Sequence, residues 1–290
     1  MLRRLALLAL VLLAPLALCP RPTRVVLGSF NIRMFPNPDT DLDQVVRAIV
    51  ELDADAFAVQ EIVDPLAFQT VLDQASASAG RHYQVALETA LCPRRRGNIH
   101  VGVVYDRDKL ALLESRLLGE FTCPKGQPSG MLALLRATDG RRLALASVHF
   151  TAGGARAQRE ERAAQWTWLA AALPDLHAEL DAPVLVAGDF NSTGYLVEHD
   201  PERRFIDNLV ARHDLQLPTA SLACSMYWKP KTPHYEPSLL DHFLAPRELA
   251  LGEPEALGMC AELACAPQKD RPAAWQNISD HCPIRIELRL

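Results

Sequence analysis

The chain has 290 residues, of which 49% are hydrophobic and 22% charged, and its formal net charge is −5. This apolar content is ample for the packed core of one large domain or two small ones. The acidic balance argues against a protein that holds nucleic acid through its overall charge, although a local basic patch could still contact phosphates.

The N-terminus has the pattern of a secretory signal peptide. An apolar run from Leu5 to Cys19 follows Arg3 and Arg4, and it is too short to span a bilayer comfortably. We expect residues 1–19 to be the signal peptide and residues 20–290 to form one exported domain, secreted or periplasmic. Loss of the two arginines lowers the net charge to −7. A lipid anchor on Cys19 is the minority interpretation, because Leu18 fits poorly before a lipidated cysteine.

The cysteine count favours disulfides in the exported protein, because six cysteines remain after the leader is removed. Fifteen connectivities are open. We expect Cys92–Cys123 and Cys260–Cys265, since each pair closes a loop between strands or within a turn. A zinc site is the alternative, but the chain has no C-x-x-C. The other two cysteines are Cys224 and Cys282.

Strands and helices alternate along the first part of the chain. We expect strands at 24–30 and 55–61, a helix from Asp39 or Thr40 to Leu52, and a helix from Pro65 that ends by Gly80. Five further strands at 83–87, 99–105, 110–118, 131–138 and 142–150 follow, some joined by hairpin turns such as Thr138-Asp139-Gly140.

The alternation resumes in the second part of the chain. We expect helices at 155–173 and 201–212, strands at 184–189, 238–244 and 284–290, and a loop at 221–237 that carries Tyr227-Trp228-Lys229. Strand–helix alternation in both halves, combined with many antiparallel hairpins, predicts an α/β fold: a four-layer sandwich of two mixed β-sheets packed face to face with helices outside.

The strand at 184–189 leads into Asp189-Phe190-Asn191, which presents a carboxylate and an amide two residues apart. Alternate residues of an extended chain point the same way, so Asp189 and Asn191 can face one cleft while Phe190 packs inside. An acceptor and a donor side by side suit a phosphate and its attacking water.

Polar residues stand at several other strand ends, where apolar sequence would otherwise continue. A buried carboxylate costs several kcal/mol unless it is paired, hydrogen-bonded or metal-bound, so a set of such residues indicates a shared site. The set is Asn31, Glu61, His149, Asp189, Asn191, Asp241, Asp280 and His281.

The motifs around these residues, in their order along the chain, resemble those of the endonuclease/exonuclease/phosphatase superfamily, which has the DNase I-like fold. The resemblance covers essentially the whole chain after the leader. The motifs are Ser29-Phe30-Asn31, Val59-Gln60-Glu61, Val148-His149-Phe150, Gly188-Asp189-Phe190-Asn191, Leu240-Asp241-His242 and Ser279-Asp280-His281-Cys282-Pro283.

The resemblance implies a metal site with oxygen ligands. Glu61 matches the family's main metal ligand, and Asn31 and Asp280 would lie near the same ion. Such a donor set suits Mg²⁺, with Mn²⁺ as the other candidate.

The resemblance also implies catalytic roles. Asp189 would orient or deprotonate the attacking water, and Asn191 would donate to the phosphate. His281, steadied by Asp280, would stabilise the transition-state charge. His149 would be the general acid for the leaving oxygen, with Asp241 to orient or polarise it. Together these roles describe metal-assisted in-line hydrolysis of a phosphate ester.

The sequence departs from the family pattern near His149. Family members pair this histidine with an acid from an earlier strand, and Gly97-Asn98-Ile99-His100-Val101 offers none. Asn98 or His100 would take that place or bind phosphate. The loop Arg94-Arg95-Arg96 is a further candidate for substrate binding.

The favoured function is therefore an exported, divalent-metal-dependent phosphodiester hydrolase that acts on nucleic acid as a DNase I-like endonuclease. A phosphatase or a sphingomyelinase-like phospholipase is the alternative, and a noncatalytic binding protein is a third. We expect a monomer without an obligate protein partner.

Overall fold

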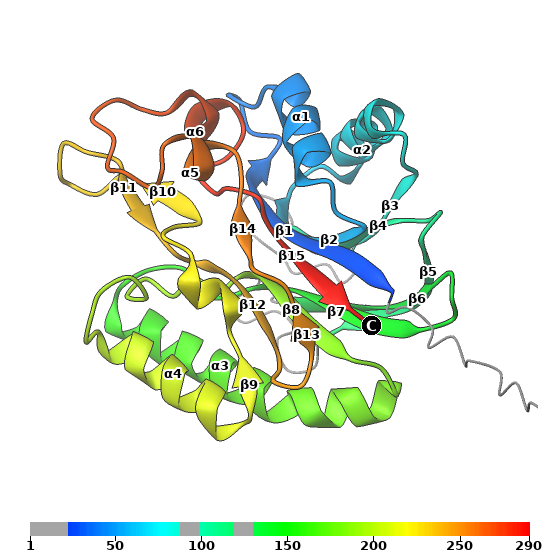
Figure 1. The fold of residues 1–290 in the computed structure, drawn as a ribbon. Coiled ribbons are helices and arrows are strands. Elements are labelled where there is room, and N and C mark those ends of the chain that lie inside the picture. The colour runs from blue at the N-terminus through cyan, green and yellow to red at the C-terminus, as the bar shows by residue number, and fades with distance from the viewer. Residues whose placement is uncertain (1–22, 88–98, 119–129) are drawn as a thin grey trace, which may run out of the picture.

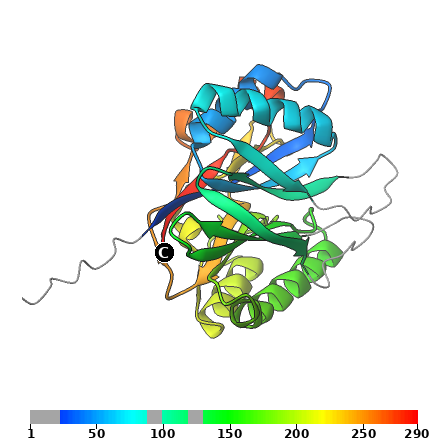
Figure 2. The ribbon, with the colours of Figure 1, turned by 90° about the vertical axis from the view of Figure 1, so that its right-hand side faces the viewer.

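The computed structural model describes residues 23–87, 99–118 and 130–290. Its centre is a pair of β-sheets that face each other (Figures 1 and 2). The first sheet contains, in order across it, β13 (Ala250–Leu251), β15 (Ile284–Arg289), β1 (Arg24–Phe35), β2 (Ala56–Ile62), β4 (His100–Asp106) and β3 (Tyr83–Leu87), with β14 (Glu255–Ala256) also paired to β15.

The second sheet contains, in order, β5 (Leu110–Leu117), β6 (Gly130–Ala137), β7 (Arg142–His149), β8 (Val184–Asp189), β12 (Asp241–Pro246) and β9 (Leu215–Gln216). Each sheet holds one parallel pair among antiparallel neighbours: β1 with β2 in the first, and β7 with β8 in the second. Both sheets are therefore mixed, which confirms the predicted sandwich.

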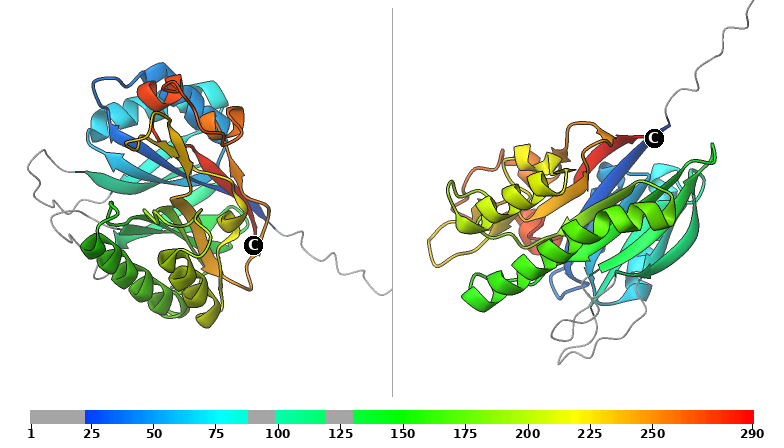
Figure 3. Two further views of the ribbon diagram at one scale, coloured as in Figure 1. Left: turned by 90° about the vertical axis from the view of Figure 1, so that its left-hand side faces the viewer. Right: turned by 90° about the horizontal axis from the view of Figure 1, so that it is seen from below.

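Two pairs of helices cover the outer faces of the sheets (Figure 3). Helices α1 (Leu42–Leu52) and α2 (Pro65–Ala79) pack on the first sheet, and α3 (Arg156–Leu180) and α4 (Pro201–Arg212) pack on the second. A third apolar layer, which includes Leu145, Phe243 and Ile286, fills the space between the sheets. Burial of apolar surface in three layers is the main force that holds this architecture together.

Local sequence signals set most helix ends. The carboxylate of Asp41 accepts a hydrogen bond from Gln44 N, so α1 begins at Leu42 rather than at the predicted Asp39 or Thr40. Pro65 opens α2 as predicted, with Asp64 as its N-cap. Helix α3 continues past the predicted residue 173 to Leu180, because the buried Leu180 still packs on the second sheet and this packing outweighs the interior Pro174.

The segment predicted as a loop at 221–237 is partly ordered. After a 3-10 turn at Pro218–Ser221, β10 (Met226–Trp228) and β11 (Glu236–Ser238) pair as a small antiparallel sheet. The strand predicted at 238–244 accordingly begins only at Asp241. Tyr227 is fully buried in this region, against the short helices α5 (Met259–Glu262) and α6 (Ala273–Asn277). The prediction was wrong here because this pairing depends on tertiary contacts.

The structure contains the disulfides Cys224–Cys265 and Cys260–Cys282. The predicted pair Cys260–Cys265 is therefore wrong. Helix α5 packs against the segments around residues 224 and 282, so Cys260 within the helix and Cys265 just after it each meet a partner distant in sequence. Cys92 and Cys123 lie outside the described residues. Within the described ranges, no helix is long and apolar enough to cross a membrane.

Candidate active site

The polar strand ends of the two sheets meet at one edge of the sandwich. In the second sheet, His149 on β7, Asp189 on β8 and Asp241 on β12 are opposite one another in register. In the first sheet, Asn31 on β1 pairs with Gln60 on β2, next to Glu61. Both parallel pairs end at this edge, and together with β12 they supply side chains from five strands, joined by those of the chain that precedes β15.

Asn31 connects the two sheets at the centre of this cluster. Its side chain is fully buried, and Nδ2 donates to Asp189 Oδ2 at 3.0 Å and to Glu61 Oε1 at 3.3 Å. The other oxygen of Glu61 accepts from Met34 N at 2.8 Å. These bonds fix the carboxylates of both sheets relative to one another.

His281 is held by Asp241. Its Nδ1 lies 2.8 Å from Asp241 Oδ2, which also accepts from Ser225 Oγ at 2.7 Å. The hydrogen bond to the imidazole ring comes from Asp241, while the charge of Asp280 adds to the rise in the pKa of His281. With Nδ1 occupied, Nε2 is the ring atom that faces Asp189, whose Oδ2 lies 3.7 Å away.

Burial and neighbouring charges shift the protonation equilibria of this pair. Burial raises the pKa of Asp189 to about 6, and the negative charge of Asp241 adds to the effect against the opposing charges of His281 and His149. Burial opposes the charge on His281, but Asp241 and Asp189 together outweigh it and hold the pKa of His281 well above its ordinary value. A carboxyl group whose pKa lies close to neutral pH therefore faces a positively charged imidazole ring.

His149 lies between the two central carboxylates. Its Nε2 is 3.6 Å from Asp189 Oδ2 and 3.7 Å from Glu61 Oε1. Glu61 thus supplies an acid from an earlier strand near this histidine. His100, the predicted alternative, begins β4 opposite Ile62, one residue beyond Glu61. Asn98 and Arg94, Arg95 and Arg96 lie outside the described residues.

In the turn after β8, Phe190 packs inside, as predicted, while Asn191 leaves the extended conformation. Phe190 is fully buried and stacks on Trp166, with ring centroids 4.5 Å apart. Asn191 adopts φ 51°, its backbone N–H donates to Asp189 Oδ1 at 2.8 Å, and its Nδ2 donates to Phe150 O at 3.1 Å. One of the two amide protons is used in this bond, so the other is left for a ligand.

The side chains also fit a divalent cation, and the observation that indicates this is an orphaned oxygen. Asp280 Oδ1 is buried and has no hydrogen-bond partner among the described residues. Burial, together with the nearby charge of Glu61, raises the pKa of Asp280. Asp280, Glu61 and Asn31 together offer hard oxygen donors, which Mg²⁺ and Mn²⁺ prefer.

Among the described residues, Asp189, Asp241 and His281 have closely spaced ligand atoms. Asp241 Oδ2 and His281 Nδ1 already bond to each other there. A fully protonated imidazole cannot bind a metal, so the raised pKa of His281 disfavours this ring as a ligand.

A family model matches residues 28–281, and its description is the endonuclease/exonuclease/phosphatase family. The chain belongs to this family. Members of the endonuclease/exonuclease/phosphatase family are phosphoester hydrolases that usually use a divalent metal, so the protein is an enzyme of this class. The match spans every polar strand end described above.

Solved structures show the same fold at low sequence identity. D. rerio TDP2 with a single-stranded DNA product has a TM-score of 0.65 and 17% identity over 92% of this chain and 100% of that chain. A mannosyl-6-phosphatase of Bacteroides thetaiotaomicron has a TM-score of 0.63 and 15% identity over 92% and 100%. The human Nocturnin catalytic domain with bound sulfate has a TM-score of 0.60 and 15% identity over 91% of this chain and 94% of that chain. No curated protein sequence matches significantly.

Ser225 is a member of the site that sequence reasoning missed. Its hydroxyl donates to Asp241 Oδ2 and accepts from the backbone N–H groups of Leu240 and Asp241. A serine beside a cysteine carries no signal of this role. Only the pairing of β10 and β11 brings it under Asp241.

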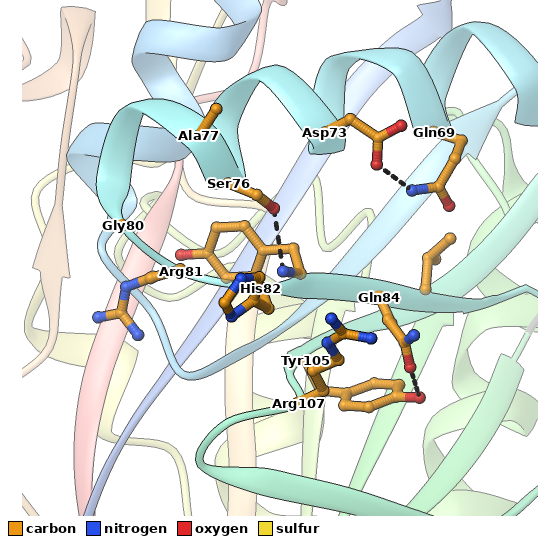
Figure 4. Close-up of a pocket in the computed structure, with 12 residues that line it drawn as sticks. Gln69, Asp73, Ser76, Ala77, Gly80, Arg81, His82, Gln84, Tyr105 and Arg107 are labelled. Carbon is orange, nitrogen blue, oxygen red and sulfur yellow. Dashed lines mark hydrogen bonds between the residues drawn. The ribbon is translucent and has the colours of Figure 1, made fainter.

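A hollow of about 850 Å³ lies apart from this cluster, between α2 and β3 (Figure 4). Tyr83, which lines the hollow, pairs with Asp106 at one end of β4, whereas His100 lies at the other end of that strand. Some of the hollow's polar side chains bond to one another, as Tyr105 Oη does to Gln84 Oε1 at 2.9 Å. This hollow shares no residue with the candidate active site.

Proposed function

We propose that the protein is a divalent-metal-dependent phosphodiester hydrolase and acts on nucleic acid as a DNase I-like endonuclease. The observation that carries the proposal is the arrangement of Asp241, His281 and Asp189, with Asp189 bonded through Asn31 to Glu61. A base, a charged imidazole and carboxylate oxygens around one position would support in-line attack on a phosphate.

Each residue then has a role that its contacts support. Asp189, with a pKa near 6, orients the attacking water and accepts its proton. His281, held charged by Asp241, donates through Nε2 to a phosphoryl oxygen and stabilises the negative charge that develops there. His149 is the general acid for the leaving oxygen, and the free N–H of Asn191 donates to the phosphate.

We place the metal on Glu61 and Asp280, with the amide oxygen of Asn31 nearby, and we propose Mg²⁺ or Mn²⁺. When bound, the ion supplies positive charge to the phosphoryl oxygens and to the leaving group. The chain's own contribution is to hold Glu61 in place, which Met34 N and Asn31 Nδ2 do from two sides.

The surface beside His281 supports a nucleic acid as the substrate. Met226 pairs with His281, and Trp228, two residues further along β10, is 49% exposed. An exposed tryptophan offers a base a stacking surface, and Lys231 in the same hairpin is exposed. The similar structure of D. rerio TDP2 with a DNA product is consistent with this choice. The solved phosphatase on the same fold keeps a phosphomonoesterase as the alternative.

We also propose that residues 1–19 are a signal peptide and that residues 20–290 form one exported, monomeric domain. The two disulfides support export, because disulfides persist in oxidising compartments.

The test is hydrolysis by purified residues 20–290 of plasmid DNA, RNA, sphingomyelin, bis-p-nitrophenyl phosphate and mannose 6-phosphate, each with Mg²⁺ and with EDTA. We expect Mg²⁺-dependent nicking of the plasmid and a loss of at least a hundredfold in His281→Ala. Arg24→Ala, at the opposite end of β1 from Asn31, serves as a purification-matched control. Cleavage of the monoester alone would overturn the endonuclease proposal, and inactivity on all five substrates would overturn the hydrolase proposal.

A further inference from the structure

Arg162 on α3 is a charged side chain without any exposure to solvent. Its Nε and Nη2 donate to the two oxygens of Glu202 on α4, at 2.7 and 3.1 Å. Nη1 donates to Thr151 O at 3.0 Å and to Gly153 O, and Nη2 donates to Thr193 Oγ1 at 3.2 Å. All five N–H donors of the guanidinium are therefore used.

Apart from Glu202 on α4, the acceptors lie on the two loops that follow the catalytic strand ends. Thr151 and Gly153 follow His149 at the end of β7, and Thr193 follows Asp189 and Asn191 at the end of β8. One planar group thus fixes both loops relative to each other and to α4. The acceptors belong to backbone and side chains of the loops themselves, so their positions depend directly on the guanidinium.

Two neighbours on the same face of α3 complete this contact. Gln165 Oε1 accepts from Thr151 N at 3.0 Å, so α3 binds both backbone groups of Thr151. Trp166 Nε1 donates to Ser192 Oγ at 3.3 Å in the β8 loop. Both side chains are buried. The three residues hold the β7 and β8 loops against one rigid helix.

We propose that Arg162 is a positioning residue: its guanidinium sets the distance between His149 and the Asp189–Asn191 turn, with Glu202 as its counterion. The inference rests on the proposed function of that site. Catalytic geometry requires such fixed distances, because a displacement of about 1 Å far from the chemistry costs about a hundredfold in rate.

Fold stability does not account for this choice of residue. A buried ion pair is often replaced by well-packed apolar residues without loss of stability, because both charges must leave water. What an apolar residue at position 162 cannot do is fix two loops at defined distances. A lysine cannot do so either, since it has three donors from a single atom instead of a planar fork.

The test compares Arg162→Lys and Arg162→Met with the wild type. We expect kcat to fall about a hundredfold in both, with KM within about threefold and with the Mg²⁺ dependence unchanged. Arg156→Met is the matched control, because Arg156 is a 91% exposed arginine on the same helix and pairs only with Glu160. Its kcat should change less than twofold. A kcat within threefold of wild type in folded Arg162→Lys would overturn the proposal.

A second variant, less disruptive than those at Arg162, tests the proposal even if the Arg162 variants fail to fold. Thr193→Val keeps the shape of the side chain but removes one acceptor of Arg162 and one donor to its counterion Glu202. We expect a fall in kcat of about three- to tenfold without a change in thermal midpoint. An unchanged kcat in this variant would contradict the proposal.

Hydrogen–deuterium exchange supplies a readout without catalysis. In Arg162→Lys we expect faster exchange in residues 150–154 and 190–194, while the middle of α3 keeps its protection. Unchanged exchange in both loops would overturn the inference. An inactive wild type whose loops nevertheless loosen in Arg162→Lys would instead refute only the proposed function.

Discussion

Asn31 Nδ2 lies 3.0 Å from Asp189 Oδ2, and this hydrogen bond joins the two sheets at the centre of the candidate active site. Both side chains are buried. A hydrogen bond to a carboxylate favours its charged form, so Asn31 opposes the rise in the pKa of Asp189 that burial causes.

Replacement of Asn31 by leucine should move the acid limb of the pH–rate profile to higher pH. The lost bond to a charged group is worth about 1.5–3 kcal/mol, which corresponds to about one to two pKa units. The profile of kcat/KM against pH for wild type and Asn31→Leu measures the shift. An acid limb at the same pH in both proteins would contradict the role assigned to this bond.

The wild-type profile should be bell-shaped. Asp189 must be ionised to accept a proton, so activity rises as pH increases through its pKa of about 6. His281 must be protonated, so activity falls above its raised pKa. Asp241→Asn removes the charge that contributes most to this rise, so it should move the alkaline limb to lower pH. Because the charge of Asp241 also raises the pKa of Asp189, the acid limb should move to lower pH as well. An alkaline limb that does not move would show that another group causes it.

Removal of either proposed carboxylate ligand should weaken metal binding. We expect Glu61→Gln and Asp280→Asn each to raise the Mg²⁺ concentration for half-maximal activity by about ten- to a hundredfold, since each removes a charged oxygen donor. Calorimetric titration with Mn²⁺ checks the binding without turnover. Asp139→Asn, in the turn between β6 and β7 at the opposite end of β7 from His149, is the control. Unchanged affinity in both ligand variants would place the ion elsewhere.

His242 should make the protein sensitive to acid. It is fully buried, which lowers its pKa to about 3, and its Nδ1 contacts Thr219 Oγ1 at 3.1 Å. Because the folded pKa lies below the unfolded value of about 6.5, this contribution is complete above pH 6.5 and is lost as pH falls toward 3. At pH 5 the loss is about 2 kcal/mol.

Urea unfolding at pH 7 and pH 5 measures this effect. The loss of unfolding free energy between the two pH values should be about 2 kcal/mol smaller in His242→Gln than in the wild type. The comparison cancels the other titrating groups. An equal loss in both proteins would show that His242 does not titrate in this range.

The disulfide Cys260–Cys282 should stabilise both the fold and the site. It closes a loop of 22 residues, for which chain entropy predicts about 3 kcal/mol. Cys282 directly follows His281, so Cys260→Ser with Cys282→Ala should also lower kcat. Denaturant unfolding and activity of this double variant test both expectations. An unfolding free energy within 1 kcal/mol of wild type would contradict the expected stabilisation of the fold. An unchanged kcat would contradict the expected effect on the site.

The sequence by itself determined the fold and most of the components of the site. Strand–helix periodicity predicted the two sheets and the helices that cover them, because apolar spacing depends only on local geometry. The polar strand ends, such as Glu61, Asp189 and His281, were visible because carboxylates and imidazoles interrupted apolar runs.

Only the tertiary structure decided how those components pair. Asp241 rather than Asp280 holds His281, Ser225 supports Asp241, and Cys260 bonds to Cys282 rather than to Cys265. None of these choices follows from distance along the chain. Each depends on strand register and on the packing of the β10–β11 hairpin, and long-range contacts of this kind arise only when the two sheets come together.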